Sequence, residues 1–276
     1  MSATTPTFET FLEAPDVPSF DLPEALEASY GRFGLPEQVV YANFVVSVDG
    51  IAAVPEMRRS SALISGGDPG DRFLVALLRA CADAVVIGAG TFRAHGGPWT
   101  AENAYPDAAE HFAELRRRAG TGPAPTLVVV SGSGRLEGPH SKLRGAIVAT
   151  TARAAEHKGE RTGGATEIWP VSETDTLNPA DVVAALWERG YRRILTEGGP
   201  TLMGQLLRAG AVDELFLTIS PVMAGGGESP RPTLAAGVDL LAGGSGRARL
   251  LSGRRHGSYL YLRYACNPQD QEANPR

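Results

Sequence analysis

Glycine, hydroxyl, acidic and arginine residues lie at or just after the ends of four apolar segments of this sequence, and their types could bind a ligand. These positions are Ser47, Asp49 and Gly50 for residues 38–48; Gly88, Gly90, Thr91 and Arg93 for 82–88; Ser131, Ser133 and Arg135 for 126–131; and Glu197, Gly198, Gly199 and Thr201 for 192–197. Glycine lets a backbone approach a ligand closely, and a helix start attracts anions. The stretch Glu-Gly-Gly-Pro at 197–200 therefore predicts a phosphate site. The alternative is that the glycines only make tight turns.

Two of these residues are acids with more than one interpretation. Asp49 follows a strongly apolar segment, in Ser-Val-Asp-Gly. It could form a turn with Gly50, or it could bind substrate and assist proton transfer at the end of a strand. Glu197 could bind a ligand or only accept hydrogen bonds from nearby backbone amides.

Several other kinds of site are excluded by missing motifs. Gly88-Ala-Gly90-Thr-Phe-Arg93 has arginine where a dinucleotide fingerprint has its third glycine, and the sequence has no P-loop. None of the five histidines has metal-ligand spacing, and the zinc deaminase signature is absent. No G-x-S-x-G occurs, so a hydrolase triad is not predicted. We therefore expect no metal.

Alternating strand and helix patterns are expected to position these residues. Residues 38–48, 82–88, 126–131, 146–151, 166–171, 192–197 and 213–222 read as strands, and 68–81, 178–190 and 200–210 read as helices. This alternation predicts an α/β three-layer sandwich with a mainly parallel central sheet. The closing strands near 247–253 and 258–265 have no helix between them, so that end should be antiparallel.

The chain divides into three expected parts. Residues 1–37 are rich in proline and acidic residues, and we expect an arm with a short helix near 23–34 that packs its aromatics on the body. Residues 38–265 form one domain, and 266–276 a flexible tail.

Composition narrows the class of protein. The chain has 276 residues, 43% of them hydrophobic, and a net charge of −5, which argues against nucleic-acid or anionic-membrane partners. Two cysteines suit a reducing cytoplasm, and no stretch reaches the length of a membrane span.

Four segments resemble one known family. They are NFVVSVDG (43–50), residues 64–91, RRILTEGGPTLMGQLL (192–207) and DELFLTISPVMAGG (213–226), in family order. In these segments the chain is similar to the reductase domain of riboflavin biosynthesis. That domain is the C-terminal half of the bifunctional pyrimidine deaminase/reductase, and its fold resembles that of dihydrofolate reductase. The resemblance implies NADPH-dependent reduction of 5-amino-6-(5-phosphoribosylamino)uracil or a related ribosylamino-pyrimidine, and a homodimer.

The resemblance also implies roles for single residues. Those implied to bind the cofactor are Gly88, Gly90, Thr91, Ser131, Ser133, Glu197, Gly198, Gly199, Thr201 and Leu202; those implied on the substrate side are Asn43, Ser47 and Ser61, with Asp49 as the catalytic acid. Ser131 and Ser133 match the loop expected at the adenosine 2′-phosphate. We expect hydride transfer without a metal or flavin.

The chain departs from the family in two places. The first 37 residues are too short for a deaminase domain, so we expect the reduction alone. Asn43 stands where bifunctional forms often have lysine, and Met-Arg-Arg at 57–59 replaces their usual Gly/Ser-rich segment before Ser61. These differences put the identity of the substrate in question more than that of the cofactor. A pterin reductase, a catalytically inactive nucleotide-binding homologue and an unrelated α/β domain remain the alternatives.

Overall fold

A computed structural model describes residues 5–55, 57, 60–95, 97–136, 143–156, 167–227, 229–242 and 246–266. The strands are β1 (Glu9–Glu13), β2 (Val39–Ser47), β3 (Ala84–Gly88), β4 (Thr126–Val130), β5 (Ile147–Thr151), β6 (Glu167–Ser172), β7 (Arg193–Gly198), β8 (Glu214–Ser220), β9 (Arg249–His256) and β10 (Tyr259–Ala265). The helices are α1 (Glu24–Tyr30), α2 (Ser60–Ile64), α3 (Pro69–Cys81), α4 (Ala89–Ala94), α5 (Ala101–Ala104), α6 (Ala109–Arg118), α7 (Ala152–Glu156), α8 (Pro179–Glu188) and α9 (Pro200–Arg208), with a 3₁₀ turn at Pro106–Ala108.

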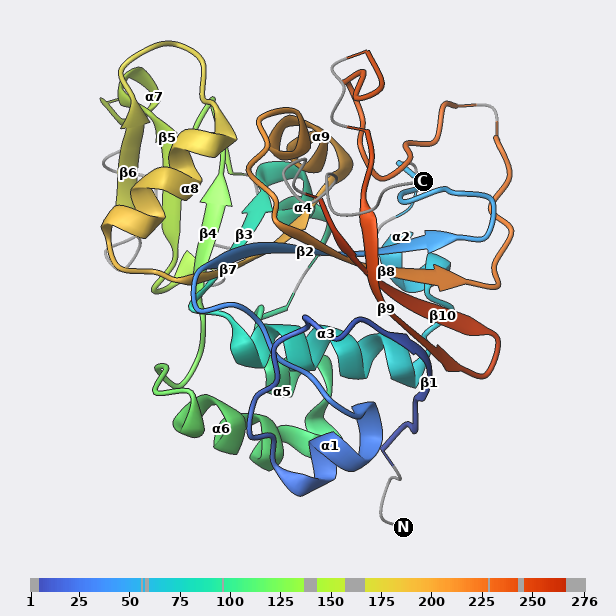
Figure 1. The fold of residues 1–276 in the computed structure, drawn as a ribbon. Coiled ribbons are helices and arrows are strands. Elements are labelled where there is room, and N and C mark those ends of the chain that lie inside the picture. The colour runs from blue at the N-terminus through green and yellow to red at the C-terminus, as the bar shows by residue number, and fades with distance from the viewer. Residues whose placement is uncertain are drawn as a thin grey trace.

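In the described part of the chain the strands form one sheet in the order β1-β9-β10-β8-β2-β7-β3-β4-β5-β6 (Figure 1). From β8 across to β6 all neighbours are parallel, whereas β8, β10, β9 and β1 pair antiparallel. The predicted mainly parallel sheet with an antiparallel C-terminal end is therefore confirmed. A short turn joins β9 to β10, which is why these two strands run in opposite directions.

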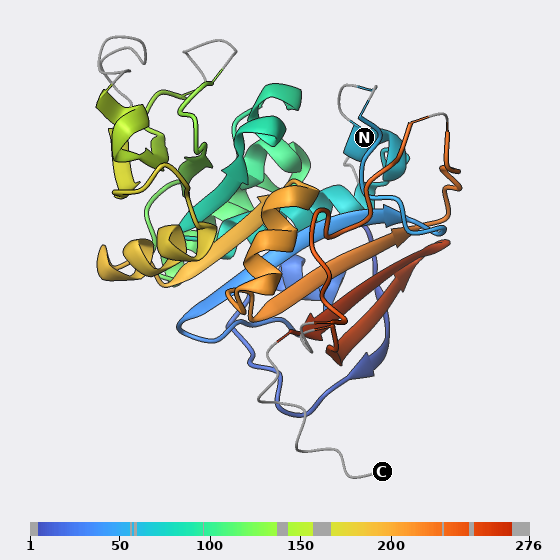
Figure 2. The ribbon, with the colours of Figure 1, turned by 90° about the horizontal axis from the view of Figure 1, so that it is seen from above.

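Helices cover both faces of the sheet. One core lies between the sheet and α1, α3 and α6, and includes Phe73, Leu77 and Phe112. A second core lies on the opposite face against α8 and α9, and includes Val182 and Leu206. Figure 2 shows the sheet from above, with α8 and α9 along one side. The predicted three-layer sandwich is confirmed.

Helix α3 illustrates how the sequence sets these elements. Asp68 accepts a hydrogen bond from the backbone N–H of Asp71 at 2.8 Å, and Pro69 occupies the first turn. Apolar residues at three- and four-residue spacing then face the core. Helix α8 begins in the same way at Asn178 and Pro179. Both predicted helices are confirmed.

The N-terminal segment contains one element that sequence patterns did not predict. The expected short helix is present as α1, but Glu9–Glu13 also forms strand β1, which pairs with the outer edge of β9. Arg254 on β9 is fully buried and donates to the backbone carbonyls of Tyr30 and Arg32 and to the carboxylate of Glu13. The segment is thus built into the main core.

Among the described residues, no helix combines the length and apolar character needed to cross a membrane. Most of the tail predicted at 266–276 lies outside the described residues.

Candidate active site

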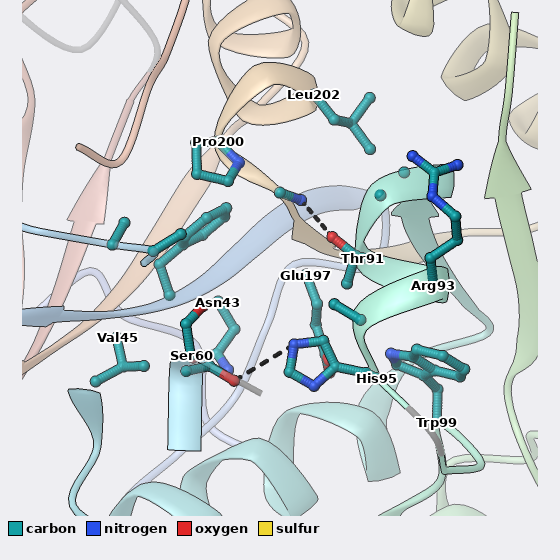
Figure 3. Close-up of a pocket in the computed structure, with 18 of the residues that line it drawn as sticks. Asn43, Val45, Ser60, Thr91, Arg93, His95, Trp99, Glu197, Pro200 and Leu202 are labelled. Atoms are coloured by element: carbon teal, nitrogen blue, oxygen red, sulfur yellow. Dashed lines mark hydrogen bonds between the residues drawn. The ribbon is translucent and has the colours of Figure 1, made fainter. Parts of the chain in front are cut away.

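A cavity of about 1270 Å³ opens where the central parallel strands end. It is lined from β2 and α2, from one side of α3, from β3 and α4, and from β7 and the start of α9. In Figure 3, Thr91, Pro200 and Leu202 lie in the upper part of the view, and Asn43, Glu197 and His95 lie below them (Figure 3). Ligands of open α/β sheets bind at this edge.

Most of the predicted site residues line this cavity. They are Asn43, Ser61, Gly88, Gly90, Thr91, Glu197, Gly199, Thr201 and Leu202. Ser47, Asp49, Ser131, Ser133 and Gly198 are absent from the lining of this cavity. The sheet edge therefore brings together residues of two predicted turns with Asn43 and Ser61, but it does not gather all of the predicted residues.

The Gly198-Gly199 turn joins β7 to α9 and is tied to α4. The hydroxyl of Thr91 donates to the carbonyl of Gly198 at 2.9 Å and accepts from the N–H of Gly199 at 2.9 Å. The peptide between the two glycines is cis, and Gly198 has a φ of +54°. A Cβ on Gly198 would lie 2.3 Å from the ring of Phe44, so the turn requires glycine there. Gly198 shapes the cavity without lining it.

Helix α9 begins without a capping side chain. Its N-cap is Gly199 and its first residue is Pro200, and neither supplies a side-chain acceptor. The first amides of a helix have no partner within the helix. Thr201 and Leu202 line the cavity at this helix start. The arrangement suits an anionic group, because backbone donors and the helix dipole point the same way.

Glu197 forms a nearly buried ion pair with Arg79 of α3. The guanidinium donates twice to the carboxylate, at 2.6 and 2.7 Å, and also donates to the carbonyl of Thr100 at 3.3 Å. Bidentate pairing fixes the orientation of both side chains. Glu197 was predicted to bind the cofactor; the structure places it in the cavity wall with its charge compensated.

Polar side chains also line the lower part of the cavity. The Oδ1 atom of Asn43 is buried and accepts no hydrogen bond from the described residues. The hydroxyl of Ser61 lies 3.5 Å from Nε2 of His95. A buried amide oxygen without a donor costs free energy, so this end of the cavity is suited to a ligand that carries hydrogen-bond donors.

Asp49 and Ser47 hold a loop instead of facing the cavity. The carboxylate of Asp49 accepts hydrogen bonds from the Ser47 hydroxyl at 2.5 Å and from the backbone N–H groups of Ala224 and Gly225 at 3.1 and 2.7 Å. These bonds, that from Ser47 most of all, hold the pKa of Asp49 at about 2. The structure therefore shows a loop-holding role for Asp49, and its catalytic role stays a prediction.

In the loop after β4, Ser131 and Ser133 were predicted to bind the cofactor, but the residue of this loop that lines the cavity is Gly132. Ser131 is buried, and its carbonyl accepts from the hydroxyl of Thr150 at 2.7 Å. Ser133 is exposed and its hydroxyl accepts from the N–H of Arg135 at 3.3 Å. Between them Gly132 lines the cavity.

Residues 38–246 match the RibD C-terminal domain family. The match covers most of the chain and includes every residue of the cavity lining named above. The chain belongs to the RibD C-terminal domain family.

Relatives of this RibD C-terminal domain include a curated archaeal protein. It comes from Archaeoglobus fulgidus, is named 2,5-diamino-6-ribosylamino-4(3H)-pyrimidinone 5′-phosphate reductase, and is 29% identical over 194 residues, 69% of this chain and 84% of the relative. This relative is covered over most of its length.

Two solved structures share the fold. A pyrimidine reductase-like protein from Corynebacterium diphtheriae matches with a TM-score of 0.65 at 24% identity, covering 87% of this chain and 97% of the other. A deaminase/5-amino-6-(5-phosphoribosylamino)uracil reductase from Thermotoga maritima matches with a TM-score of 0.60 at 19% identity, covering 83% of this chain and 57% of the other. At these identities the matches establish the fold alone.

Several residues that line the cavity of this RibD C-terminal domain were not predicted from the sequence. They are Asp71 and Arg72 of α3, and His95 and Trp99 after α4. Asp71 is the most unusual, because it is a buried carboxyl: burial raises its pKa to about 6. The sequence does carry a signal, Asp-Pro-Gly-Asp at 68–71, in which only the first aspartate is needed to cap the helix.

Among the described residues of this RibD C-terminal domain, no group of three or more histidine, cysteine or acidic side chains is placed to hold a metal ion.

Replacing Asp49 with asparagine tests its role in this RibD C-terminal domain. We expect faster amide hydrogen exchange at Ala224 and Gly225, because one charged acceptor is lost, and catalytic rates within about threefold of the original protein. The folded-state pKa of Asp49 lies below its ordinary 3.8, so its contribution to stability is present above pH 4 and disappears as the pH falls toward 2. A large loss of turnover with unchanged exchange would restore the catalytic interpretation.

Proposed function

We propose that this protein is an NADPH-dependent reductase of a ribosylamino-pyrimidine 5′-phosphate, of the kind used in riboflavin biosynthesis. The proposed substrate is 5-amino-6-(5-phosphoribosylamino)uracil or its 2,5-diamino-pyrimidinone counterpart. The observation that carries the proposal is the cavity of this family member. Its wall contains the start of α9, which follows a glycine, and at its other end the polar side chains of Asn43 and Ser61. The archaeal relative with that reductase name supports the substrate class.

The upper part of the cavity fits a dinucleotide. A Cβ on Gly90 would meet no atom within 4 Å, so the wall there is open to a ligand. Gly88 lines the same wall, and the first turn of α9 offers backbone donors to a diphosphate. Gly88, Gly90 and Thr91 would lie along the cofactor, and Gly199, Thr201 and Leu202 would hold its diphosphate. Ser133 and Arg135 would lie near an adenosine 2′-phosphate.

When bound, the reduced nicotinamide supplies a hydride. The protein orients the substrate beside it and excludes water. Asn43 and Ser61 would bind the pyrimidine or ribose through hydrogen bonds. The Arg79–Glu197 pair keeps the wall between the two ends rigid, since both side chains are nearly buried and doubly bonded.

Oligomeric state is part of the proposal, because the resemblance implies a homodimer. Strand β1 already pairs with the outer edge of β9. A dimer through the C-terminal strands would therefore use their faces and not the edge of β9. Light scattering of the purified protein would give the mass directly.

The test is loss of reduced-nicotinamide absorbance with the ribosylamino-pyrimidine phosphate, run with NADPH and with NADH. Dihydrofolate is the comparison substrate, because Asp71 is a buried acid of the kind a pterin reductase needs. We expect oxidation with the pyrimidine and a preference for NADPH. Oxidation with dihydrofolate alone, or cofactor binding without any turnover, would overturn the proposal.

A further inference from the structure

Asp71 lies in the first turn of α3, at the substrate end of the cavity. It is 7% exposed and lines the same space as Asn43 and Glu197. Its backbone N–H is used in capping α3, but its carboxyl is not part of the cap. A carboxyl so buried is uncommon in proteins unless it has a partner or a function.

Asp68, three residues earlier, has a clear structural task. Its Oδ2 accepts from the N–H of Asp71 and from the hydroxyl of Tyr261, and it is absent from the cavity lining. The two aspartates of one helical turn thus differ: Asp68 holds the helix to β10, and Asp71 faces the ligand space.

The surroundings of Asp71 favour its protonated form. Burial has the largest effect. A hydrogen bond with Thr218 of β8 lowers the pKa, and the carboxylates of Asp68 and Glu197 raise it, so that the pKa of Asp71 rises to about 6. The charge of Glu197 is compensated by Arg79, and the two nearby tyrosines, 259 and 261, remain neutral donors. Arg72 beside it donates to the carbonyl of Ala104 and lies against Tyr105. Asp71 is therefore not held as a carboxylate by an ion pair.

We propose that the carboxyl of Asp71 touches the bound substrate and donates the proton that opens its ribose ring. This inference rests on the proposed function. In the closed ribosylamine the C1′–O4′ bond breaks, its electron pair goes to O4′, and O4′ takes the proton of Asp71. The nitrogen lone pair forms the C1′=N bond of an iminium. A hydride from reduced nicotinamide then adds at C1′ and returns the π electrons to nitrogen, giving the ribitylamine. Water reprotonates Asp71.

Replacement of Asp71 by asparagine keeps the size of the side chain but removes the proton. We expect kcat to fall about a hundredfold, the lower end of what a general acid contributes. Affinity for the pyrimidine, measured by calorimetry on the complex with oxidised cofactor, should stay within about threefold. The control is Asp68→Asn, which keeps a capping oxygen and should retain kcat on the acidic plateau, where Asp71 is protonated in both proteins.

The pH profile separates proton donation from a merely structural role. In the original protein kcat/KM should fall above about pH 6, because the active form of Asp71 is protonated. Asp71→Asn should remove this decline. Asp68→Asn should move it to lower pH, since a like charge that raises the pKa of Asp71 is gone.

Stability provides a readout that does not depend on turnover. The folded-state pKa of Asp71 lies above its ordinary 3.8, so its ionisation opposes folding increasingly from pH 4 to pH 6, and fully above that. Asp71→Asn should therefore melt at or above the temperature of the original protein at pH 8. A structural requirement for the carboxylate would instead lower the melting temperature.

The outcomes distinguish the two proposals. If the original protein does not reduce the pyrimidine, the proposed function fails and this inference fails with it. If it does, while Asp71→Asn keeps kcat within threefold and the same pH profile, only the inference is overturned. A tenfold or larger loss of pyrimidine affinity without a change in profile would also overturn it, by making Asp71 a binding residue. If Asp71→Asn does not fold, an unshifted profile in Asp68→Asn would count against the proposal.

Discussion

Replacing Arg254 with methionine is expected to destabilise the protein by about 3–5 kcal/mol, the cost of breaking a buried ion pair by removing one partner. Arg254 is 2% exposed, and its guanidinium donates to the carbonyls of Tyr30 and Arg32, to Glu13 and to Ser252, while it stacks over the ring of Tyr30. Methionine fills a similar volume but leaves these acceptors unsatisfied. Denaturant unfolding at neutral pH would measure the change.

The neighbouring Arg255 supplies the control. It lies on the same strand, but its pair with Glu9 is exposed on both sides. Exposed pairs of this kind contribute little, so Arg255→Met should unfold at the same denaturant concentration as the original protein. Limited proteolysis should cut the segment 5–35 faster in Arg254→Met only. Equal behaviour of the two variants would show that the buried arginine does not anchor this segment.

Replacing Gly198 with alanine is expected to abolish measurable reductase activity and to weaken NADPH binding at least a hundredfold. The new methyl group would lie 2.3 Å from the ring of Phe44, so the turn must shift. A shift separates the Gly198 carbonyl and the Gly199 N–H from the hydroxyl of Thr91, and it moves the start of α9. Cofactor fluorescence gives the affinity, and absorbance gives the rate.

Gly210 is the matched control for this change. It also has a positive φ, +64°, but a Cβ there would meet nothing within 4 Å. Gly210→Ala therefore carries the cost of the left-handed backbone, about 1–2 kcal/mol, without the clash. It should bind NADPH normally. If Gly198→Ala bound the cofactor as well as Gly210→Ala did, the turn would not be part of the cofactor site.

Local patterns were sufficient for the central elements. The apolar run of β2, the capped helices α3 and α8, and the β7–α9 turn each contain their signals within about fifteen residues, and all appear as expected. The predicted ends of parallel strands also bring residues from separate turns, such as Gly88, Thr91 and Gly199, into one cavity.

The remaining features depend on partners far away in the sequence. Strand β1 has no buried alternation of its own, because it pairs at an edge with β9. The carboxylate of Asp49 accepts hydrogen bonds from the backbone amides of residues 224 and 225, and no sequence pattern near residue 49 reveals these partners. Asp71 resembles an ordinary helix-start acid until the cavity beside it is seen. Short-range spacing predicts elements, but it does not say which of two acids lines the cavity.

The pairing of β1 with β9 also sets an order of assembly during synthesis. Glu13 meets Arg254 across 241 positions of sequence, and at about 5–20 residues per second a ribosome needs roughly 10–50 seconds to make that distance. Throughout this interval the apolar side chains of the emerging arm, Phe8, Leu26 and Tyr30 among them, lack part of their final environment. Only when β9 has been synthesised can this segment complete its packing, because β1 pairs with that strand and Glu13 binds its Arg254.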